Sequence, residues 1–326
     1  MYIRKKVIIT HPMPDAWITP ILAQCDVFFG PNDMQGLSPE LEKYLPEVDG
    51  LIAFLCDKID KRLIDLSPRL KVICNFAAGT DNIDINTFSQ RKIPVGYTPG
   101  ALTNATADLT IGLMLAVNRQ LLKAAEDAKG GSWKMWYPDR WLGQDLDSST
   151  FGIIGMGKIG MAVAKRARSF GMQIVYHSRH ENIEVESSCQ ANRVTFERLL
   201  EKSDVVSLHA PLTPETHHMI DQNALRRMKP TATLINTARG SEVDTEALYE
   251  ALQARKILAA GLDVTDPEPL PPSHPLYSLP NCLILPHIGS ANESTRKKMA
   301  EMTCDNLLAG LHDAKLPYCA NPEIYS

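Results

Sequence analysis

The chain has 326 residues, of which 44% are hydrophobic and 22% charged, and its formal net charge is −4. This length is enough for two domains, because single hydrophobic cores stop growing at about 250–300 residues. The mildly acidic balance gives no electrostatic reason to expect a nucleic acid or an anionic membrane as partner. No uncharged apolar run reaches the roughly 18 residues that a transmembrane helix needs, so we expect neither partner.

The N-terminus and the cysteines indicate the cellular compartment. Charged residues at positions 4–6 precede an apolar run that is too short for a signal peptide and predicts a first strand. The seven cysteines are scattered without a C-x-x-C pair, which suits reduced thiols and favours neither a disulfide framework nor a zinc site. We therefore expect a cytoplasmic protein without a bound metal.

Residues 1–99 alternate short apolar runs with polar or helical connections, which predicts a small α/β domain with a mostly parallel sheet. Gly79 follows the fourth run, and a glycine there can bring backbone amides close to a ligand carboxylate. A plain turn at the end of a strand is an equal alternative. The runs expected to form strands are 7–10, 27–29, 50–55, 70–77 and 93–97.

From Thr103 the pattern changes to one long helix that is expected to end at the glycine pair 130–131. Its apolar residues lie on more than one face, which predicts burial. Four large aromatic residues follow in a stretch without clear periodicity. In a chain with only 6% aromatic residues, this cluster favours an interface or a lid over a core. Its members are Trp133, Trp136, Tyr137 and Trp141.

An apolar run beginning at Phe151 enters the glycines Gly155, Gly157 and Gly160, which have G-x-G-x-x-G spacing. In dinucleotide sites the first glycine permits a tight turn, the second lets a pyrophosphate approach, and the third lets the helix pack on the strand. The run 172–176 supplies a second strand and completes a βαβ unit. The spacing alone also fits a glycine-rich turn, but the flanks favour a cofactor loop. This loop consists of Gly155, Met156, Gly157, Lys158, Ile159 and Gly160.

The end of the second strand predicts which nicotinamide cofactor is used. An NAD site usually has Asp or Glu about 20 residues after the glycines, whereas this chain has His177, Ser178 and Arg179. The carboxylate that would repel a 2′-phosphate is missing, so we predict NADP, with NADPH preferred and NAD still able to bind. The alternative is a solvated basic turn in which Arg179 points into water.

Further strands are expected at 205–209, 233–236, 259–264 and 282–285, with helices between them and a last helix at 294–311. Strands that alternate with helices predict an α/β fold with a doubly wound parallel sheet. Ligands of such sheets bind beyond the carboxyl ends of the strands. Polar motifs follow these runs directly, and they contain His209, Arg239, Asp263 and His287.

Four motifs in one order, at 155–160, 236–240, 261–270 and 286–291, make the chain similar to a known family. Over nearly its whole length it resembles the D-isomer-specific 2-hydroxyacid dehydrogenases, and within them most closely the glyoxylate/hydroxypyruvate and 2-ketoaldonate reductases. The resemblance implies two Rossmann-like domains. A dinucleotide-binding domain of residues 101–288 would be inserted in a substrate domain formed by residues 1–100 and 289–326.

The resemblance implies a catalytic trio in which Arg239 clamps the 2-oxo acid, His287 is the acid/base and Glu268 is its partner. The chemistry agrees, because arginine binds a carboxylate in a bidentate fork and lysine does not. A histidine exchanges protons near neutrality, and a neighbouring carboxylate stabilises its imidazolium form and fixes its tautomer. Without the resemblance, a single histidine after a strand would more often be structural.

The resemblance also assigns binding residues and a partner. We expect a homodimer in which Trp141 or Trp136 reaches the neighbouring site. The substrate-binding residues besides the trio are Leu55, Ala78, Gly79, Ser290 and Trp141. The cofactor-binding residues besides the glycine loop are Thr106, His177, Ser178, Arg179, His209, Ala210, Pro211, Thr237, Ala238, Arg239, Asp263, His287 and Gly289.

The expected activity is NADPH-dependent reduction of glyoxylate, hydroxypyruvate or 2-ketogluconate to the D-2-hydroxy acid, with His287 as proton donor. Nucleotide sensors of the corepressor type share this fold and remain an alternative, as do phosphite and phosphoglycerate dehydrogenases. Phosphite dehydrogenases have a lysine where this chain has Ala78. Phosphoglycerate dehydrogenases usually have an acidic residue at the position that selects the cofactor. His217 and His218 are expected to be solvated, because the sequence offers no third ligand at metal spacing.

Overall fold

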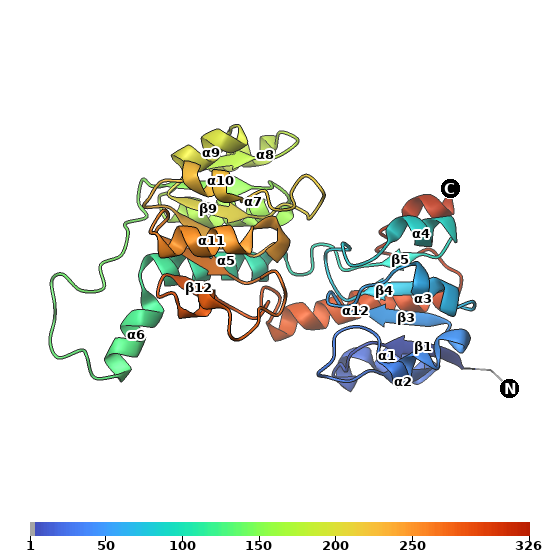
Figure 1. The fold of residues 1–326 in the computed structure, drawn as a ribbon. Helices are drawn as coiled ribbons and strands as arrows, with labels where there is room; N and C mark the ends of the chain where they lie inside the picture. Colours follow the sequence, from blue (N-terminus) through green and yellow to red (C-terminus); the bar gives the residue numbers. More distant parts are fainter. Residues whose placement is uncertain (1–3) are drawn as a thin grey trace. The chain divides into compact units, whose positions relative to one another are not determined.

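The computed structural model describes residues 4–326, which form two compact units. The first unit comprises the chain up to Leu102 together with Asn292–Ser326, and the second comprises Thr103–Ala291. Each unit has its own parallel sheet with helices on both faces (Figure 1). Among the described residues, no helix is both long and apolar enough to span a lipid bilayer.

The first unit is built on five parallel strands: β1 (Lys5–Ile9), β2 (Cys25–Phe29), β3 (Gly50–Ala53), β4 (Val72–Asn75) and β5 (Val95–Gly96). Their order in the sheet is β2-β1-β3-β4-β5. Every residue of β3 and β4 is buried, as expected of parallel strands that are covered on both faces. Ile9 pairs with Ile52, so the carboxyl ends of β1 and β3 lie side by side.

Helices cover both faces of this first sheet. Ile18 and Met299 belong to one hydrophobic core, and Leu63 and Phe88 belong to the other. The helices of the first core are α1 (Asp15–Gln24) and α12 (Glu293–Leu311). Those of the second are α2 (Pro39–Glu42), α3 (Lys61–Leu66) and α4 (Ile85–Gln90). Short 3₁₀ helices lie at Leu45–Glu47 and Pro322–Tyr325.

The second unit has seven parallel strands: β6 (Thr150–Ile154), β7 (Gln173–His177), β8 (Asn192–Arg193), β9 (Val205–Leu208), β10 (Thr233–Asn236), β11 (Ala259–Leu262) and β12 (Cys282–Ile284). Their order is β12-β11-β10-β9-β6-β7-β8. β6 lies between β7 and β9. The chain adds β7 and β8 on one side of β6 and then β9 to β12 on the other side, so the strand order reverses at β6. Such a switch point opens a crevice where open α/β sheets bind their ligands.

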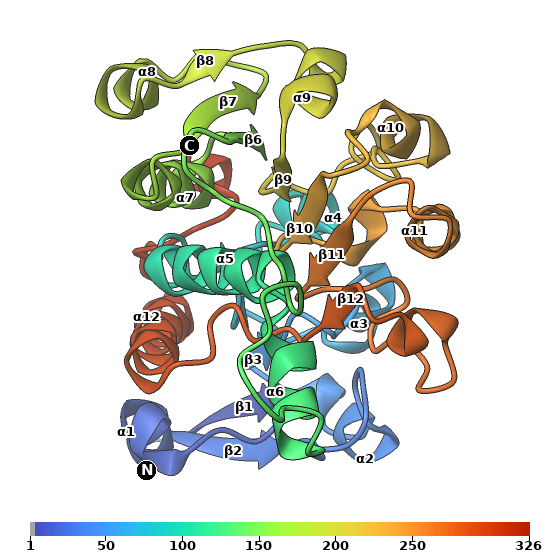
Figure 2. The same cartoon turned by 90° about the vertical axis from the view of Figure 1, so that its left-hand side faces the viewer.

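Figure 2 shows the helices of the second unit on the two faces of its sheet. Met114 and Val163 belong to the core under one set of helices, and Leu225 and Leu248 to the core under the other. The first set is α5 (Thr103–Asn118), α7 (Lys158–Ser169) and α8 (Ile183–Cys189). The second is α9 (Phe196–Lys202), α10 (Gln222–Arg227) and α11 (Thr245–Gln253), with 3₁₀ turns at Gly240–Glu242 and Pro275–Ser278. The predicted doubly wound α/β fold is confirmed.

The prediction of one long helix from Thr103 to the glycine pair is wrong. α5 ends at Asn118, and a separate helix, α6 (Leu121–Lys129), follows Gln120, whose φ of 50° is left-handed. The Asn118 side chain accepts a hydrogen bond from the Thr233 hydroxyl, and its carbonyl accepts one from the Gln144 amide. The bond from Thr233, the first residue of β10, holds the end of α5 on the sheet, and the bond from Gln144 joins it to the segment before β6.

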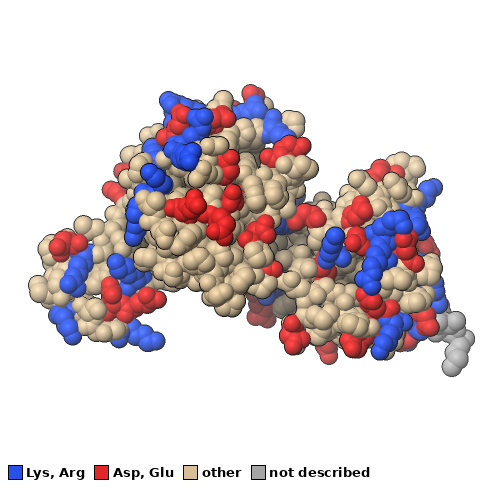
Figure 3. All heavy atoms as spheres, in the orientation of Figure 1, with Lys and Arg blue, Asp and Glu red and all other residues tan. Residues whose placement is uncertain are grey.

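α6 and residues 130–149 extend away from the rest of the second unit (Figure 1). No residue of α6 is buried, and Trp133 and Trp136 are 62% and 78% exposed. Trp141 is half-buried and donates a hydrogen bond from Nε1 to Asp127 at 2.7 Å. The aromatic cluster is therefore not part of a core. Over the rest of the face seen in Figure 3, acidic and basic side chains are mixed.

Candidate active site and cofactor site

Close backbone packing surrounds two glycines of the loop between β6 and α7. Gly155 has a φ of +95°, and a Cβ there would lie 2.5 Å from the backbone nitrogen of Ala210. A Cβ at Gly160 would lie 2.2 Å from the carbonyl oxygen of Gly155. The first glycine thus lets the loop contact the end of β9, and the second lets α7 pack against the loop. Both positions require glycine for steric reasons.

Gly157 differs from the other two glycines, because a Cβ there would meet no protein atom within 4 Å. It precedes α7 as its N-cap residue and offers no side chain to bond the first amides of the helix. These amides and the positive end of the helix dipole form an anion site. The loop therefore fits the pyrophosphate of a dinucleotide, with Gly157 leaving the space that the phosphates need.

Substituting alanine at these glycines should separate folding from cofactor binding. We expect Gly155→Ala to lower the free energy of unfolding by about 2 kcal/mol or more, because the new methyl group clashes with backbone and the left-handed conformation disfavours alanine. Gly157→Ala should leave the free energy of unfolding unchanged and weaken cofactor binding at least about tenfold. Urea unfolding and fluorescence titration with NADPH measure the two effects. Unaltered NADPH binding by Gly157→Ala would contradict the role of the loop.

The end of β7 presents polar groups beside this loop. Ser178 is half-buried and donates to the carbonyl of His180, and Arg179 is exposed. Arg193 of β8 donates to the carbonyls of Ser178 and Arg179 at 3.0 and 2.9 Å. His177 lies 3.2 Å through Nδ1 from the Val194 carbonyl. Arg193 was not predicted as a site residue, because only the pairing of β7 with β8 brings its guanidinium to the segment after β7.

His287 and Glu268 form a direct pair. Nδ1 of His287 lies 2.6 Å from Oε1 of Glu268, and both side chains are partly exposed, at 24% and 34%. The imidazole therefore donates its Nδ1 proton to the carboxylate, which leaves Nε2 as the nitrogen that can exchange a proton with a ligand. The backbone of His287 is left-handed, with a φ of 53°. The loop holds the imidazole in one orientation.

Asp263 fixes the backbone around that histidine. Its buried carboxylate accepts hydrogen bonds from the amides of Ile288 and Gly289 at 2.7 and 2.8 Å. Its carbonyl accepts the amide of His287 at 2.8 Å. Burial raises the pKa of Asp263, and the two amides oppose that rise. The hydroxyl of Thr106 on α5 donates to the Gly289 carbonyl at 3.2 Å, so α5 is tied to the same loop.

The loop after β10 carries Arg239. Asn236 organises it, because its amide group donates to the Arg239 carbonyl at 2.7 Å and accepts the amide of Ala238 at 3.0 Å. A Cβ at Gly240 would lie 1.9 Å from the carbonyl oxygen of Thr265, so this loop packs directly against the segment that leads to Glu268. The residues predicted from this motif were Thr237, Ala238 and Arg239, and the positioning contacts of Asn236 were not predicted.

His209 follows β9 and contacts the loop at Gly155 through its backbone. Its Nε2 lies 2.8 Å from the Ser207 hydroxyl. Burial lowers the pKa of His209 to about 3, so this imidazole is neutral at physiological pH. Nearby, the hydroxyls of Thr237 and Thr110 lie 2.9 Å apart. His209 therefore contributes a neutral polar group to this edge of the sheet and no positive charge.

This neutral histidine predicts acid sensitivity of the ligand-free protein. In the unfolded chain the pKa of a histidine is about 6.5. In the folded state the pKa of His209 is about 3, so between these two pH values only the unfolded state binds the proton. Stability must then fall as the pH drops below about 6.5. Between about pH 7 and pH 5 we expect a loss of up to about 2 kcal/mol, an upper value because His209 is partly exposed. Urea unfolding of wild type and His209→Asn at both pH values measures it. Equal pH slopes would contradict the prediction.

Three predicted substrate residues, Leu55, Ala78 and Gly79, lie in the first unit, whereas Ser290 lies in the second. Leu55 follows β3 and is 41% exposed. The Gly79 carbonyl accepts a hydrogen bond from Asn75 at 2.8 Å. The first unit therefore fixes the loop after β4 by its own contacts.

The second unit also has a cavity of about 260 Å³ near the junction of α5 and α6. Its lining includes Asn118, Leu142, Ala259 and Cys282. Ala259 and Cys282 begin β11 and β12. The cavity thus opens at the amino ends of these strands, and the residues described above follow the carboxyl ends.

His217 and His218 are not as isolated as the sequence suggested. Their rings stack with centroids 4.0 Å apart, and both are exposed. A carboxylate oxygen of Asp266 lies within 4.8 Å of a ring nitrogen of each. The exposure of both rings agrees with the expectation that they are solvated, and the segment that leads to Glu268 brings Asp266 to this turn although the sequence shows no third ligand at metal spacing.

Comparisons with known proteins agree with this arrangement. The family model "D-isomer specific 2-hydroxyacid dehydrogenase, NAD binding domain" matches residues 111–289. A glyoxylate reductase from Thermofilum pendens is 43% identical over 98% of this chain and 96% of its own length. The solved structure of the TT0316 protein from Thermus thermophilus has a TM-score of 0.90 and 45% identity, covering 97% of this chain and 99% of that one. An NADPH-dependent glyoxylate/hydroxypyruvate reductase from Sinorhizobium meliloti, solved with NADP and malonate, has a TM-score of 0.86 and 29% identity over 98% of each chain.

Proposed function

The chain belongs to the D-isomer specific 2-hydroxyacid dehydrogenase family, and from this premise we propose that it reduces glyoxylate and similar small 2-oxo acids to 2-hydroxy acids of the D series with NADPH. The observation that carries the proposal is the pair formed by His287 and Glu268, at 2.6 Å, in a loop that Asp263 holds in place. An imidazole fixed in this way can give a proton to an oxygen that gains an electron pair. Reduction of a keto group requires that step.

Each of the three side chains has a chemical task in this proposal. Arg239 would bind the substrate carboxylate with two parallel hydrogen bonds and so orient the keto carbon. His287 would transfer its Nε2 proton to the keto oxygen as that oxygen becomes an alkoxide, and Glu268 would stabilise the imidazolium before the transfer. The nicotinamide would supply the hydride. Leu55, Ala78, Gly79 and Ser290 would complete the substrate site.

The cofactor residues present fit a dinucleotide. The first turn of α7 and the open space at Gly157 would hold the pyrophosphate. Support for NADPH comes from the positions directly after β7, where Ser178 and Arg179 stand in place of the acidic residue that would repel a 2′-phosphate. Arg193 adds a second cation there, although it is also paired with Glu181 at 3.6 Å. Likewise, the Sinorhizobium meliloti relative is an NADPH-dependent enzyme solved with NADP. We propose NADPH as the preferred donor and NADH as the poorer one.

Exposed apolar side chains on α6 and the segment after it support a homodimer. Leu121, Leu122, Trp136 and Leu142 are all at least 48% exposed, which is costly in water and typical of an interface. Trp136 or Trp141 would then reach the site of the partner. Light scattering at micromolar concentration tests the dimer, and a monomer would remove this part of the proposal.

Steady-state kinetics test the activity. Glyoxylate, hydroxypyruvate and 2-ketogluconate are each offered with NADPH and with NADH. We expect turnover of at least one acid and a higher kcat/KM for NADPH, and Arg179→Asp should reverse the cofactor preference while leaving the order of the acids unchanged. A preference for NADH in the wild type would overturn the cofactor assignment alone. Tight NADPH binding without turnover of any acid would overturn the reductase and favour a nucleotide sensor.

A further inference from the structure

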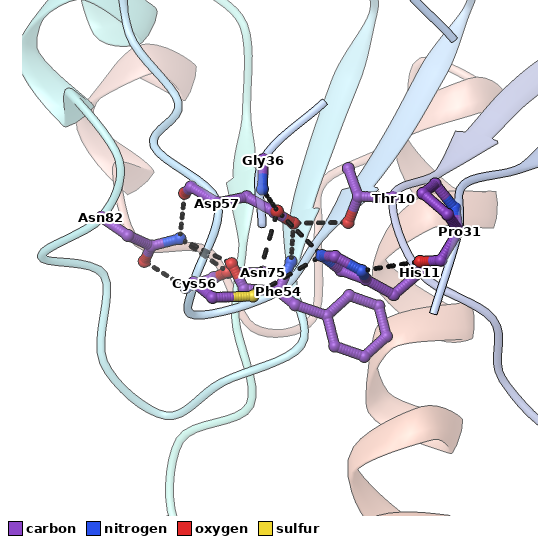
Figure 4. Close-up of polar contacts among 9 residues, drawn as sticks. All are labelled: Thr10, His11, Pro31, Gly36, Phe54, Cys56, Asp57, Asn75 and Asn82. Atoms are coloured by element: carbon purple, nitrogen blue, oxygen red, sulfur yellow. Dashed lines mark hydrogen bonds and ion pairs between the residues drawn. The ribbon is translucent and has the colours of Figure 1, made fainter. Parts of the chain in front are cut away.

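Parallel pairing of β1 with β3 gathers a second group of reactive side chains, in the first unit (Figure 4). His11 follows β1, and Cys56 and Asp57 follow β3. The amide of Thr10 donates to the Ile52 carbonyl at 3.0 Å, which extends the pairing to the edge of the group. These residues are far from the glycine loop in sequence and have no task in the proposed reduction.

We propose that His11, Cys56 and Asp57 form a Zn²⁺-binding site. Nε2 of His11 lies 2.9 Å from Oδ1 of Asp57 and 3.5 Å from Sγ of Cys56, and that Sγ lies 4.0 Å from the same Oδ1. Zinc binds nitrogen, sulfur and oxygen at about 2.0, 2.3 and 2.1 Å in tetrahedral geometry, which sets neighbouring ligand atoms about 3.3–3.6 Å apart. The three edges lie close to that spacing, so shifts of a few tenths of an ångström admit one ion.

Outer contacts already orient the imidazole and the carboxylate. Nδ1 of His11 lies 3.2 Å from the Pro31 carbonyl, so it donates its proton there and Nε2 faces the site. Oδ2 of Asp57 accepts hydrogen bonds from the amide of Phe54 at 2.8 Å and from the Thr10 hydroxyl. Oδ1 accepts the amide of Gly36 at 3.1 Å and directs its other lone pair toward His11. A backbone carbonyl behind a ligating histidine is a frequent arrangement in metal sites, because it fixes the tautomer.

The local charges suit a divalent cation. Two atoms that both prefer to accept, Nε2 of His11 and Oδ1 of Asp57, lie 2.9 Å apart and need a shared proton or a cation between them. Zn²⁺ would replace that proton and the thiol proton of Cys56, and the carboxylate and the thiolate would balance its charge. Asp57 is 1% exposed, whereas Cys56 is exposed. The open side at Cys56 gives the ion an entry path and leaves a fourth position for water.

Within residues 4–326 a second group with three potential ligands is present, and it is less well supported. His217 and His218 stack on each other and are both exposed. Their ligand atoms and that of Asp266 lie within 4.8 Å of one another. The two rings are oriented by stacking on each other. At His11, in contrast, the Pro31 carbonyl orients the ring through Nδ1. We therefore place the ion at His11 and use the histidine pair as an internal comparison.

The site is connected to the loop that contains Gly79. Asn82 donates from Nδ2 to the carbonyls of Phe54 and Asp57, each at 3.0 Å. Its Oδ1 accepts a hydrogen bond from Asn75, which also donates to the Gly79 carbonyl. A bound ion that shifts the segment from Phe54 to Asp57 would therefore also shift Asn82, Asn75 and the Gly79 carbonyl. If Gly79 binds substrate, as the proposed function holds, Zn²⁺ should raise KM. The binding test below does not depend on that consequence.

Cobalt provides the direct measurement, because a thiolate bound to Co²⁺ gives a charge-transfer absorption in the near ultraviolet. The full chain is treated with a chelator, dialysed with a phosphine reductant and titrated with Co²⁺. We expect a thiolate band that saturates at one equivalent and disappears when Zn²⁺ is added. Competition with a chromophoric chelator then gives the Kd for Zn²⁺. Absence of the band at one equivalent would overturn the proposal.

Variants identify the ligands. Cys56→Ser should abolish the thiolate band and raise the Kd for Zn²⁺ at least about tenfold, and His11→Gln should also raise the Kd at least about tenfold. The control Cys319→Ser removes a half-buried thiol elsewhere in the first unit and should leave both readouts unchanged. The double variant His217→Gln, His218→Gln should likewise have no effect. Unfolding curves verify that each variant is folded. A band that survives Cys56→Ser, or that the histidine double variant removes, would contradict the assignment.

Discussion

Replacing His287 by alanine should lower kcat by about 10²–10⁴-fold, the range in which a general acid usually contributes, and leave the Kd for NADPH within a factor of about two. In the proposed mechanism Nε2 gives the proton to the substrate, because Nδ1 is held by Glu268 at 2.6 Å. Because His287 has a left-handed backbone, alanine adds strain there, and His287→Asn is the matched variant, since asparagine tolerates that conformation. Both variants should lose activity equally.

Stopped-flow reduction of glyoxylate and fluorescence titration with NADPH measure these effects. Glu268→Gln provides a graded comparison, because the amide keeps a hydrogen-bond acceptor for Nδ1 and removes the negative charge. Its kcat should fall between those of the wild type and His287→Asn. An unchanged kcat for His287→Asn would rule out the histidine as the proton donor, whatever the effect of alanine.

Replacing Arg239 by lysine should lower kcat/KM for glyoxylate by about 10²-fold, or about 2.7 kcal/mol. Lysine preserves the positive charge but cannot make two parallel hydrogen bonds to a carboxylate. The smallest acid has the fewest other contacts and should suffer most. The guanidinium already donates from Nη1 to the Ala238 carbonyl at 2.7 Å, so it is ordered before substrate binds.

Arg193→Lys is the matched control for this prediction, because it makes the same chemical change at the segment after β7. It should affect the KM for NADPH and leave the KM for glyoxylate unchanged. Saturation kinetics with each substrate varied in turn distinguish the two effects. A kcat/KM for Arg239→Lys within about threefold of the wild type would contradict the bidentate clamp.

Much of the sheet was predictable because parallel strands covered on both faces are continuous apolar runs. β9, β10 and β11 fall within the predicted runs for that reason. β8 was missed, since Asn192 and Arg193 are two exposed polar residues without such a signal. The break at Gln120 was also missed, because it depends on Asn118 bonding to residues that are distant in sequence.

The site shows the same division between local and distant information. The glycine loop is a local pattern, and its spacing together with the flanking apolar runs indicated where close packing would occur. The group around His11 was invisible in the sequence, because His11 is more than 40 positions from Cys56 and Asp57 and only the register of β1 with β3 brings them together. The scattered cysteines therefore predict only ordinary reduced thiols. Pairing between distant segments is the information that a single sequence lacks.

The hydrogen bond from Thr106 to the Gly289 carbonyl joins the segment where the chain enters the second unit to the segment where it leaves. Both residues lie within a few positions of the unit boundaries, and Gly289 is also held by Asp263. This bond therefore ties the first turn of α5 to the loop that follows His287, inside the second unit. The backbone at His287 is thus set by contacts that the second unit makes within itself, through Asp263 and through Thr106.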